Sequence, residues 1–171
     1  AVGTTNVIEN CGNEANVSGG SNVGGILGNS QNYNTTVTVT GCYNSGSISA
    51  SDRAGGIIGR YNNSNPRITD CYNTGAVSSS TYAAGILAGS SSNISRCYNV
   101  GTITGKDASK TGAFTTSSYN SLTDCYYLTS SIPSGALDNG ANAMTLTEMQ
   151  TPLLTALGAE KWKQVRGVVA N

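Results

Sequence analysis

Five cysteines recur about every 30 residues and divide most of this chain into repeats, at a period typical of stacked supersecondary units. They are Cys11, Cys42, Cys71, Cys97 and Cys125. A glycine-rich motif follows each of the first four cysteines at a nearly constant distance, and the central glycines of this motif are Gly25, Gly56, Gly85 and Gly112. Such a repeat predicts an architecture in which each unit packs only on its neighbours.

Each repeat contains short segments that favour β-strands. Apolar, often β-branched residues alternate there with small polar ones between Gly, Asn and Ser, at residues 36–39, 47–49, 56–58 and 102–104. About three such strands per repeat, running in the same direction, predict an all-β chain: a right-handed-type parallel β-helix, or solenoid, of about four to five coils. We expect the solenoid to occupy residues 1–130 and a capping segment with short helices to occupy residues 131–171.

In such a solenoid, equivalent residues of successive coils lie above one another, about 4.8 Å apart. The five cysteines would then form a column of buried thiols, because free cysteine is among the most buried residue types. Disulfides are the alternative in an exported protein, but an odd number, one per repeat, with parallel side chains, favours reduced thiols. A second column of side-chain amides is expected to bond from rung to rung at a corner of the coil: Asn13, Asn44, Asn73 and Asn99.

A tyrosine follows four of the cysteines, and side chains of a strand alternate between its two faces. These rings are therefore expected to form an aromatic column outside the coil, exposed or under a covering segment: Tyr43, Tyr72, Tyr98 and Tyr126. Aromatic rings can stack on sugars, so Tyr43, Tyr72 and Tyr98 are candidate ligand-binding residues. The variable loops between repeats add Tyr33 and Tyr61 to this candidate site.

Residues 131–171 differ in character from the repeats. Thr145 and Glu148 match a capping box, and Pro152 and Gly158 match the first and last positions of a second short helix. A cap is needed physically because the last coil of a solenoid exposes both its core and a strand edge. We expect that end to be covered by Met149, Leu153, Leu154, Leu157 and Trp162.

Composition argues against catalysis and against binding of nucleic acid. The chain has no His, 11% charged residues, and 9 basic against 9 acidic side chains. Without a His to activate a nucleophile, no Ser/His or Cys/His arrangement can form, and without a basic stripe no nucleic-acid partner is expected. We therefore expect that the chain is not an enzyme.

Paired carboxylates are the alternative that a catalytic hypothesis would need, because parallel β-helices do support carbohydrate-cleaving enzymes. Asp70 and Asp124 share the position before a cysteine, but they would lie two rungs apart, roughly 10 Å, which is wide for an acid/base pair. The interpretation as solvated surface charge is favoured for all the candidates: Asp52, Asp70, Asp107, Asp124 and Asp138.

No cofactor and no metal are expected, because the chain has no cluster of converging carboxylates of the kind that binds calcium. No apolar run approaches the roughly 18 to 20 residues that a membrane span needs, so we expect no membrane insertion by this fragment. Its polarity comes mainly from Ser, Thr, Asn and Gly, which is typical of exported, repetitive β-rich surfaces.

The two motifs together resemble the GLUG repeat, which occurs in tandem in bacterial surface proteins, including non-catalytic regions of secreted proteases and large adhesin-like proteins. The matching residues are Gly-Gly-Ile-Leu-Gly at 24–28, Gly-Gly-Ile-Ile-Gly at 55–59, and Cys-Tyr-Asn-x-Gly from Cys42, Cys71 and Cys97. The resemblance covers residues 7–128, and the closing glycine is replaced in the third and fourth copies. It implies a β-solenoid at a bacterial surface, and it carries no active site.

The expected function is therefore that of a cell-surface structural or adhesion module, the non-catalytic repeat region of a larger exported protein. Its expected partners are host or microbial surface glycans or proteins. The alternative is a carbohydrate-binding module that uses the tyrosine column and the variable loops. Ice binding would require regular outward Thr-x-Thr arrays, and only residues 36–40 and 102–104 approach that pattern.

Overall fold

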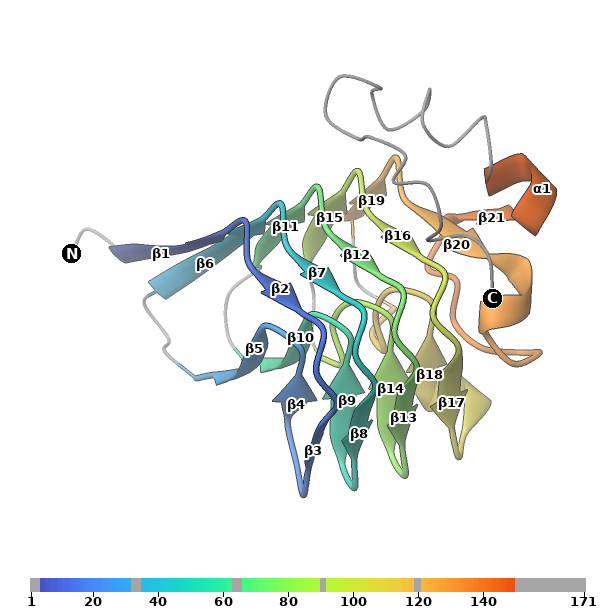
Figure 1. The fold of residues 1–171 in the computed structure, drawn as a ribbon, viewed down its shortest axis with the longest axis horizontal. Helices are drawn as coiled ribbons and strands as arrows, with labels where there is room; N and C mark the ends of the chain where they lie inside the picture. The colour runs from blue at the N-terminus through green and yellow to red at the C-terminus, as the bar shows by residue number, and fades with distance from the viewer. Residues whose placement is uncertain (1–3, 32–34, 63–65, 90–91, 119–120, 150–171) are drawn as a thin grey trace.

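The computed structural model describes residues 4–31, 35–62, 66–89, 92–118 and 121–149. The strands all pair in parallel, and strands that neighbour each other in a sheet come from successive repeats (Figure 1). The predicted all-β parallel solenoid is thus confirmed, with about four coils and one short helix. Each repeat forms one coil because its Gly, Asn and Ser residues bend the chain between strands that are two to six residues long.

Two sheets run the length of the stack. The first sheet has five strands: β1 (Thr4–Glu9), β6 (Thr35–Thr40), β11 (Arg67–Thr69), β15 (Asn93–Ser95) and β19 (Ser121–Thr123). The second sheet has six strands: β2 (Gly12–Asn13), β7 (Tyr43–Asn44), β12 (Tyr72–Asn73), β16 (Tyr98–Asn99), β20 (Tyr126–Leu128) and β21 (Asn142–Met144). We call them the long sheet and the tyrosine sheet.

Shorter sheets close each coil. The third sheet contains β3 (Val17–Gly19), β8 (Ile48–Ala50), β13 (Val77–Ser79) and β17 (Ile103–Gly105). The fourth contains β4 (Val23–Gly24), β9 (Arg53–Gly55), β14 (Tyr82–Ala84) and β18 (Thr111–Gly112). The fifth pairs β5 (Leu27–Ser30) with β10 (Ile58–Tyr61). The remaining elements are two 3-10 turns and one helix: η1 (Ala108–Lys110), η2 (Thr129–Ser131) and α1 (Leu146–Met149).

The turn between the long sheet and the tyrosine sheet has the same backbone in every coil. The residue before each cysteine has φ between 49° and 63°, in the left-handed region: Asn10, Gly41, Asp70, Arg96 and Asp124. Gly, Asn and Asp tolerate this conformation best, and they occupy four of the five positions. The chain therefore turns sharply there, and after the first coil this turn directs the cysteine into the interior.

The core consists of two apolar clusters separated by a polar waist. The larger cluster lies under the long sheet and contains the buried cysteines with Ile57, Leu87 and Phe114, and the smaller one contains Ile48 and Val77. Along each coil, the residues between those of the two clusters include the buried asparagine and the glycines of the second motif. The waist is therefore made by the two motifs that define the repeat.

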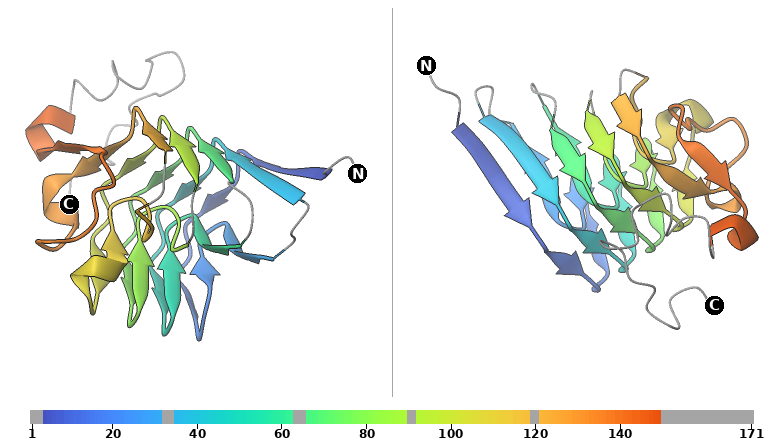
Figure 2. Two further views of the ribbon diagram at one scale, coloured as in Figure 1. Left: turned by 180° about the vertical axis from the view of Figure 1, so that it is seen from behind. Right: turned by 90° about the horizontal axis from the view of Figure 1, so that it is seen from above.

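The C-terminal end of the stack is closed (Figure 2). Ile132 packs against both apolar clusters, and β21 extends the tyrosine sheet beyond β20. The predicted capping box is confirmed: the Thr145 amide donates to Glu148 Oε2 at 2.7 Å, and the Glu148 amide donates to Thr145 Oγ1 at 3.4 Å. Met149 is buried as expected, and Leu153, Leu154, Leu157 and Trp162 lie outside the described residues.

Candidate functional site

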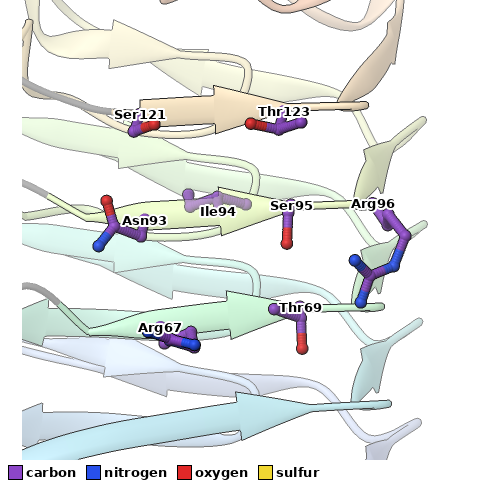
Figure 3. A pocket seen from close by; sticks show the side chains of 8 residues that line it. All are labelled: Arg67, Thr69, Asn93, Ile94, Ser95, Arg96, Ser121 and Thr123. Atoms are coloured by element: carbon purple, nitrogen blue, oxygen red, sulfur yellow. The ribbon is translucent and has the colours of Figure 1, made fainter.

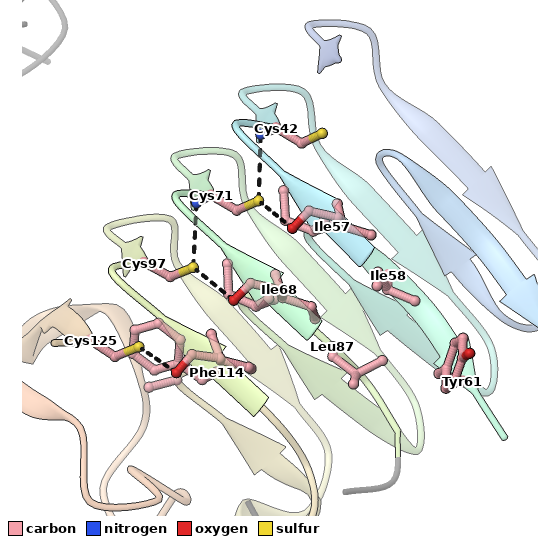
Figure 4. Packing of buried hydrophobic residues seen from close by; sticks show 14 of the residues in the cluster. Cys42, Ile57, Ile58, Tyr61, Ile68, Cys71, Leu87, Cys97, Phe114 and Cys125 are labelled. Carbon is pink, nitrogen blue, oxygen red and sulfur yellow. Dashed lines mark hydrogen bonds between the residues drawn. The ribbon is translucent and has the colours of Figure 1, made fainter. Parts of the chain in front are cut away.

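The cysteines form the predicted column (Figure 4). The amides of Cys42 and Cys71 each donate to the sulfur of the next coil's cysteine, at 3.4 and 3.3 Å. Each thiol in turn lies near the carbonyl two residues before it; Cys71 Sγ is 3.1 Å from the oxygen of Thr69. A thiol is small enough for this corner and serves as both weak donor and weak acceptor. All five cysteines are free, and the four after Cys11 are buried.

The four thiols after Cys11 are buried and therefore screened from solvent. Burial, together with hydrogen bonds to the thiols of Cys125 and Cys71, raises the pKa of Cys97 well above its ordinary value. Hydrogen bonds with the neighbouring thiols shift the pKa values of Cys71 and Cys125 the other way, downward. A nucleophilic cysteine needs access to solvent as well as a lowered pKa, and none of these four thiols has that access. The cysteine column therefore supports packing between coils.

We expect Cys11 alone to react with a thiol reagent in the folded protein, and all five cysteines to react after unfolding without a reductant. The reason is that Cys11 is exposed in the first coil whereas the other four thiols are covered by neighbouring coils. Counting labelled cysteines by mass spectrometry of the intact protein and of its peptides checks both numbers. Fewer than five groups after unfolding would mean that disulfides are present.

The asparagines form a second column at the waist. Side-chain Nδ2 of Asn44 donates to Oδ1 of Asn73 at 2.7 Å, and Asn73 donates likewise to Asn99 at 2.8 Å. Each Nδ2 also donates to the carbonyl two residues further on, as Asn73 does to Gly75 at 2.9 Å. Asn44, Asn73 and Asn99 are fully buried. The amide column thus satisfies polar groups that burial would otherwise leave without partners.

The second motif is glycine because the asparagine column occupies the space beside it. A Cβ atom at Gly56 would lie 2.6 Å from the amide carbon of Asn73 and would overlap the carbonyl oxygen of Gly85. The equivalent atom at Gly85 would lie 2.6 Å from the amide carbon of Asn99. The spacing between the two motifs therefore places Gly25, Gly56 and Gly85 against the asparagine column. The expectation for Gly112 is corrected: it is in register with Ala84 and Gly55, one position earlier, so Ala113 takes the central position in the fourth coil.

The tyrosine column stacks on itself outside the coil. The rings of Tyr43 and Tyr72 are 5.3 Å apart at 10°, and those of Tyr72 and Tyr98 are 4.9 Å apart at 2°. A stacked ring turns its faces to its neighbours and only its edge to solvent. The face of Tyr43 toward the first coil lies over Gly12, where a Cβ atom would overlap the ring. A sugar could therefore meet the edges of this column but not stack on the faces between its rings.

The two ends of the column differ in environment. Tyr98, with Tyr126 beside it, packs around Met149, and this burial raises the pKa of Tyr98. Tyr43 is accessible, and its hydroxyl donates to Glu14 at 2.8 Å, which raises its pKa. One of the two expectations was a segment that covers the column, and such a segment is present at Tyr98. The edges of Tyr43 and Tyr72 are partly exposed.

Tyr61 does not join this face. Tyr61 was expected at an adjustable edge, but it is fully buried in the larger core cluster, where its hydroxyl accepts a hydrogen bond from the Val37 amide at 3.1 Å. This corrects the expectation for Tyr61, because strand β10 continues through the glycine motif and carries the ring inside. Tyr33 lies outside the described residues.

The candidate carboxylates are surface groups. Asp70 binds the guanidinium of Arg96 through two hydrogen bonds of 2.7 Å. Asp52 and Asp107 lie near Arg53 and Lys110, at 3.7 and 3.8 Å. Within the described ranges, no group of three or more Cys, Asp or Glu side chains is placed to hold a metal ion. In the same part of the chain, no helix has the length and apolar character to cross a membrane.

An open groove of about 470 Å³ runs over the outer face of the long sheet (Figure 3). One row across it consists of Arg67, Asn93 and Ser121, which are in register on β11, β15 and β19. Hydroxyl groups form the parallel row: Thr69, Ser95 and Thr123. Arg67 and Asn93 are exposed, so the groove presents a guanidinium, an amide and several hydroxyls to solvent. Sequence reasoning missed it, although the polar residue at every second position of these strands was the available signal.

These columns and sheets define the class of the chain: a parallel β-solenoid of stacked repeats. No family model and no curated protein matches it. Among solved structures, it is similar to a "putative immunoglobulin A1 protease" from Bacteroides ovatus, with a TM-score of 0.65 and 20% sequence identity over 95% of this chain and 73% of that chain. At this identity the likeness shows the fold alone.

Alkaline solution is expected to destabilise the protein. The pKa values of Cys97 and Tyr98 are raised from ordinary values of 9.0 and 10.0 by burial. The unfolded chain therefore releases these protons at lower pH than the folded protein, so the stability that the neutral groups provide is complete below about pH 9 and falls above it. The slope is about 1.4 kcal/mol per pH unit for each group. Urea unfolding from pH 7 to 11, with reductant, tests this; a constant or rising midpoint above pH 9 would contradict it.

Proposed function

We propose that this chain is a non-catalytic structural or adhesion module of a bacterial cell surface, the repeat region of a larger exported protein. The observation that carries the proposal is that the side chains that recur in every coil bond or pack onto the next coil. Cysteine, asparagine and tyrosine columns each join one rung to another, so the repeat builds an extended body. The GLUG resemblance supports placing that body at a bacterial surface.

The outer faces support the same proposal. A solenoid of this kind separates its structural columns from its surface, because the outward positions of each strand can change without altering the interior. The long sheet carries Thr, Ser, Asn and Arg outward and so offers a broad polar face. Such a face can contact a partner surface without a catalytic group.

Antibodies against the purified protein test the proposed location. We expect them to label intact cells of the source organism and to detect peptides that protease treatment releases from those cells. An intracellular protein of the same cells, probed in parallel, controls for lysis. Labelling that appears only after permeabilisation would overturn the surface location.

Carbohydrate recognition is the second candidate, and the groove over the long sheet favours it. Arg67, Asn93 and the neighbouring hydroxyls are groups that hydrogen-bond to sugar hydroxyls or carboxylates. A glycan array separates the candidates. Reproducible binding that Arg67→Ala or Asn93→Ala removes would favour recognition at the groove, and loss on Tyr43→Ala or Tyr72→Ala would instead place it at the tyrosine edge. An array without binding supports the structural role.

A further inference from the structure

The two ends of the stack differ: β21 and α1 lie beyond the last coil at the C-terminal end, whereas β1 to β5 are the outermost strands at the other end (Figure 2). At the C-terminal end, the asparagine column stops at Ser131, whose hydroxyl oxygen accepts from Asn99 Nδ2 at 3.3 Å, and Ile132 covers both apolar clusters. At the opposite end, Cys11 is exposed although the equivalent Cys42 is fully buried. The N-terminal face, defined here as the outer side of β1 to β5, thus exposes positions that are interior in later coils.

The cysteine and asparagine columns both end on this face, and in each the last side chain is a hydrogen-bond acceptor with no donor among the described residues. In later coils, Sγ of Cys42 accepts from the Cys11 amide at 3.5 Å, and Oδ1 of Asn44 accepts from Asn13 Nδ2 at 2.7 Å. No such donor is found for Sγ of Cys11 or Oδ1 of Asn13 in the part of the chain that the structure describes. Each column therefore lacks the rung that would precede it.

Apolar side chains and strand edges on the same face are also incomplete. Ile8, Val17 and Leu27 are half-buried, whereas their partners in the next coil, Val39, Ile48 and Ile58, are buried. Each of β1 to β5 pairs with a strand of the second coil on one side only, within the described residues. An open edge of parallel strands is a template for another strand.

We propose that the N-terminal face docks one more coil of the same Cys-Tyr-Asn repeat, parallel to β1 to β5 and supplied by polypeptide ahead of β1 in the larger protein. This rests on the proposed repeat-region function and adds the direction of the array: coils are added on the N-terminal side, and the C-terminal side is its end. The docked coil supplies a cysteine amide to Cys11 and an asparagine Nδ2 to Asn13, and it covers the apolar edge.

A second copy of this chain, placed face to face, fits less well. The Cys11 amide already donates to Cys42, and Nδ2 of Asn13 donates to both Asn44 and the Ala15 carbonyl, at 2.7 Å each. A second copy therefore has the same acceptors to offer and neither of the required donors. Only a coil in the same direction presents both donors in register.

The test is an extended chain in which a copy of residues 38–66 is joined directly ahead of Val7. Thr38 pairs with Val7 and with Arg67, so this junction separates the added cysteine from Cys11 by the same length of chain that separates Cys42 from Cys71. We expect labelling of Cys11 by a thiol reagent to slow by roughly two orders of magnitude, because the thiol then reacts only when the added coil opens. The added cysteine becomes the reactive one, and peptide mapping distinguishes the two.

The matched control is the same extended chain with Asn44→Leu made only in the copy, which removes the donor to Asn13. We expect Cys11 to remain more reactive there than in the intact extension. A second extension, a copy of residues 67–92 ahead of Val7, guards against a poor junction. If neither extension protects Cys11, or if the original protein forms a dimer in which Cys11 is already protected, the proposal is overturned. Because the test uses purified protein, its failure is distinct from a failure of the surface labelling.

Discussion

The Gly56→Ala variant is expected to lose about 4 kcal/mol or more of unfolding free energy and to fail to fold at ordinary temperature. A Cβ atom there overlaps the carbonyl oxygen of Gly85 in the next coil and comes within 2.6 Å of the Asn73 amide carbon. Both neighbours are fixed, one by the backbone of the stack and the other by the asparagine column, so neither can move away alone. Circular dichroism and urea unfolding measure the effect.

Gly20→Ala is the matched control for this change. A Cβ atom at Gly20 meets no other atom within 4 Å, so this variant should unfold within about 0.5 kcal/mol of the original protein. If both variants were equally stable, the close packing of the glycine motif against the asparagine column would be contradicted. Equal destabilisation of both would point instead to a general sensitivity to losing glycine.

The Asn73→Leu variant is expected to have the second large effect. Its amide accepts from Asn44 and donates to Asn99 and to the Gly75 carbonyl, at 2.7, 2.8 and 2.9 Å. The substitution removes the acceptor of one N–H of Asn44, whose Nδ2 keeps its bond to the Gly46 carbonyl, and it removes the donor to Asn99 Oδ1 and to the Gly75 carbonyl. Each bond lost in this buried place costs about 1–3 kcal/mol. We expect a loss of about 3–6 kcal/mol in the free energy of unfolding, measured by urea titration.

Asn93→Ala is the control for Asn73→Leu, because it also removes an asparagine side chain from a strand, but at an exposed position. Asn93 is exposed on the outer face of β15, so its loss should change the unfolding free energy by no more than about 0.5 kcal/mol. If Asn73→Leu were as mild as this control, the buried amide column would be contributing little. Water entering the waist would be the physical explanation to examine next.

The repeat allowed most of the interior to be predicted from the sequence. Because parallel coils place equivalent residues above one another, the positions of Cys42, Cys71 and Cys97 followed from spacing alone, as did the asparagine column. The spacing of the motifs along the sequence could not show which columns contact each other across the coil. The contact between Gly56 and Asn73 joins residues of neighbouring coils on opposite sides of the waist, and it depends on how narrow the coil is there.

Two features could not be predicted from the sequence, each for a local reason. The residue before each cysteine adopts a left-handed conformation, and Asn10, Gly41 and Asp124 indicated this, but Arg96 hid the pattern because its conformation is not one that arginine favours. Tyr61 looked like a loop residue because Asn-rich sequence follows it. Its place in the core is set by the continuation of β10, which sequence periodicity could not distinguish from a turn.

The most direct test of the stacked-repeat account is a crystal structure with a sulfur anomalous difference map. The account predicts that the five cysteine sulfurs form one column, each about 4.8 Å from the next. Their order along the column is Cys11, Cys42, Cys71, Cys97 and Cys125. Sulfurs scattered through the molecule, or paired at the disulfide distance of about 2.05 Å, would contradict it.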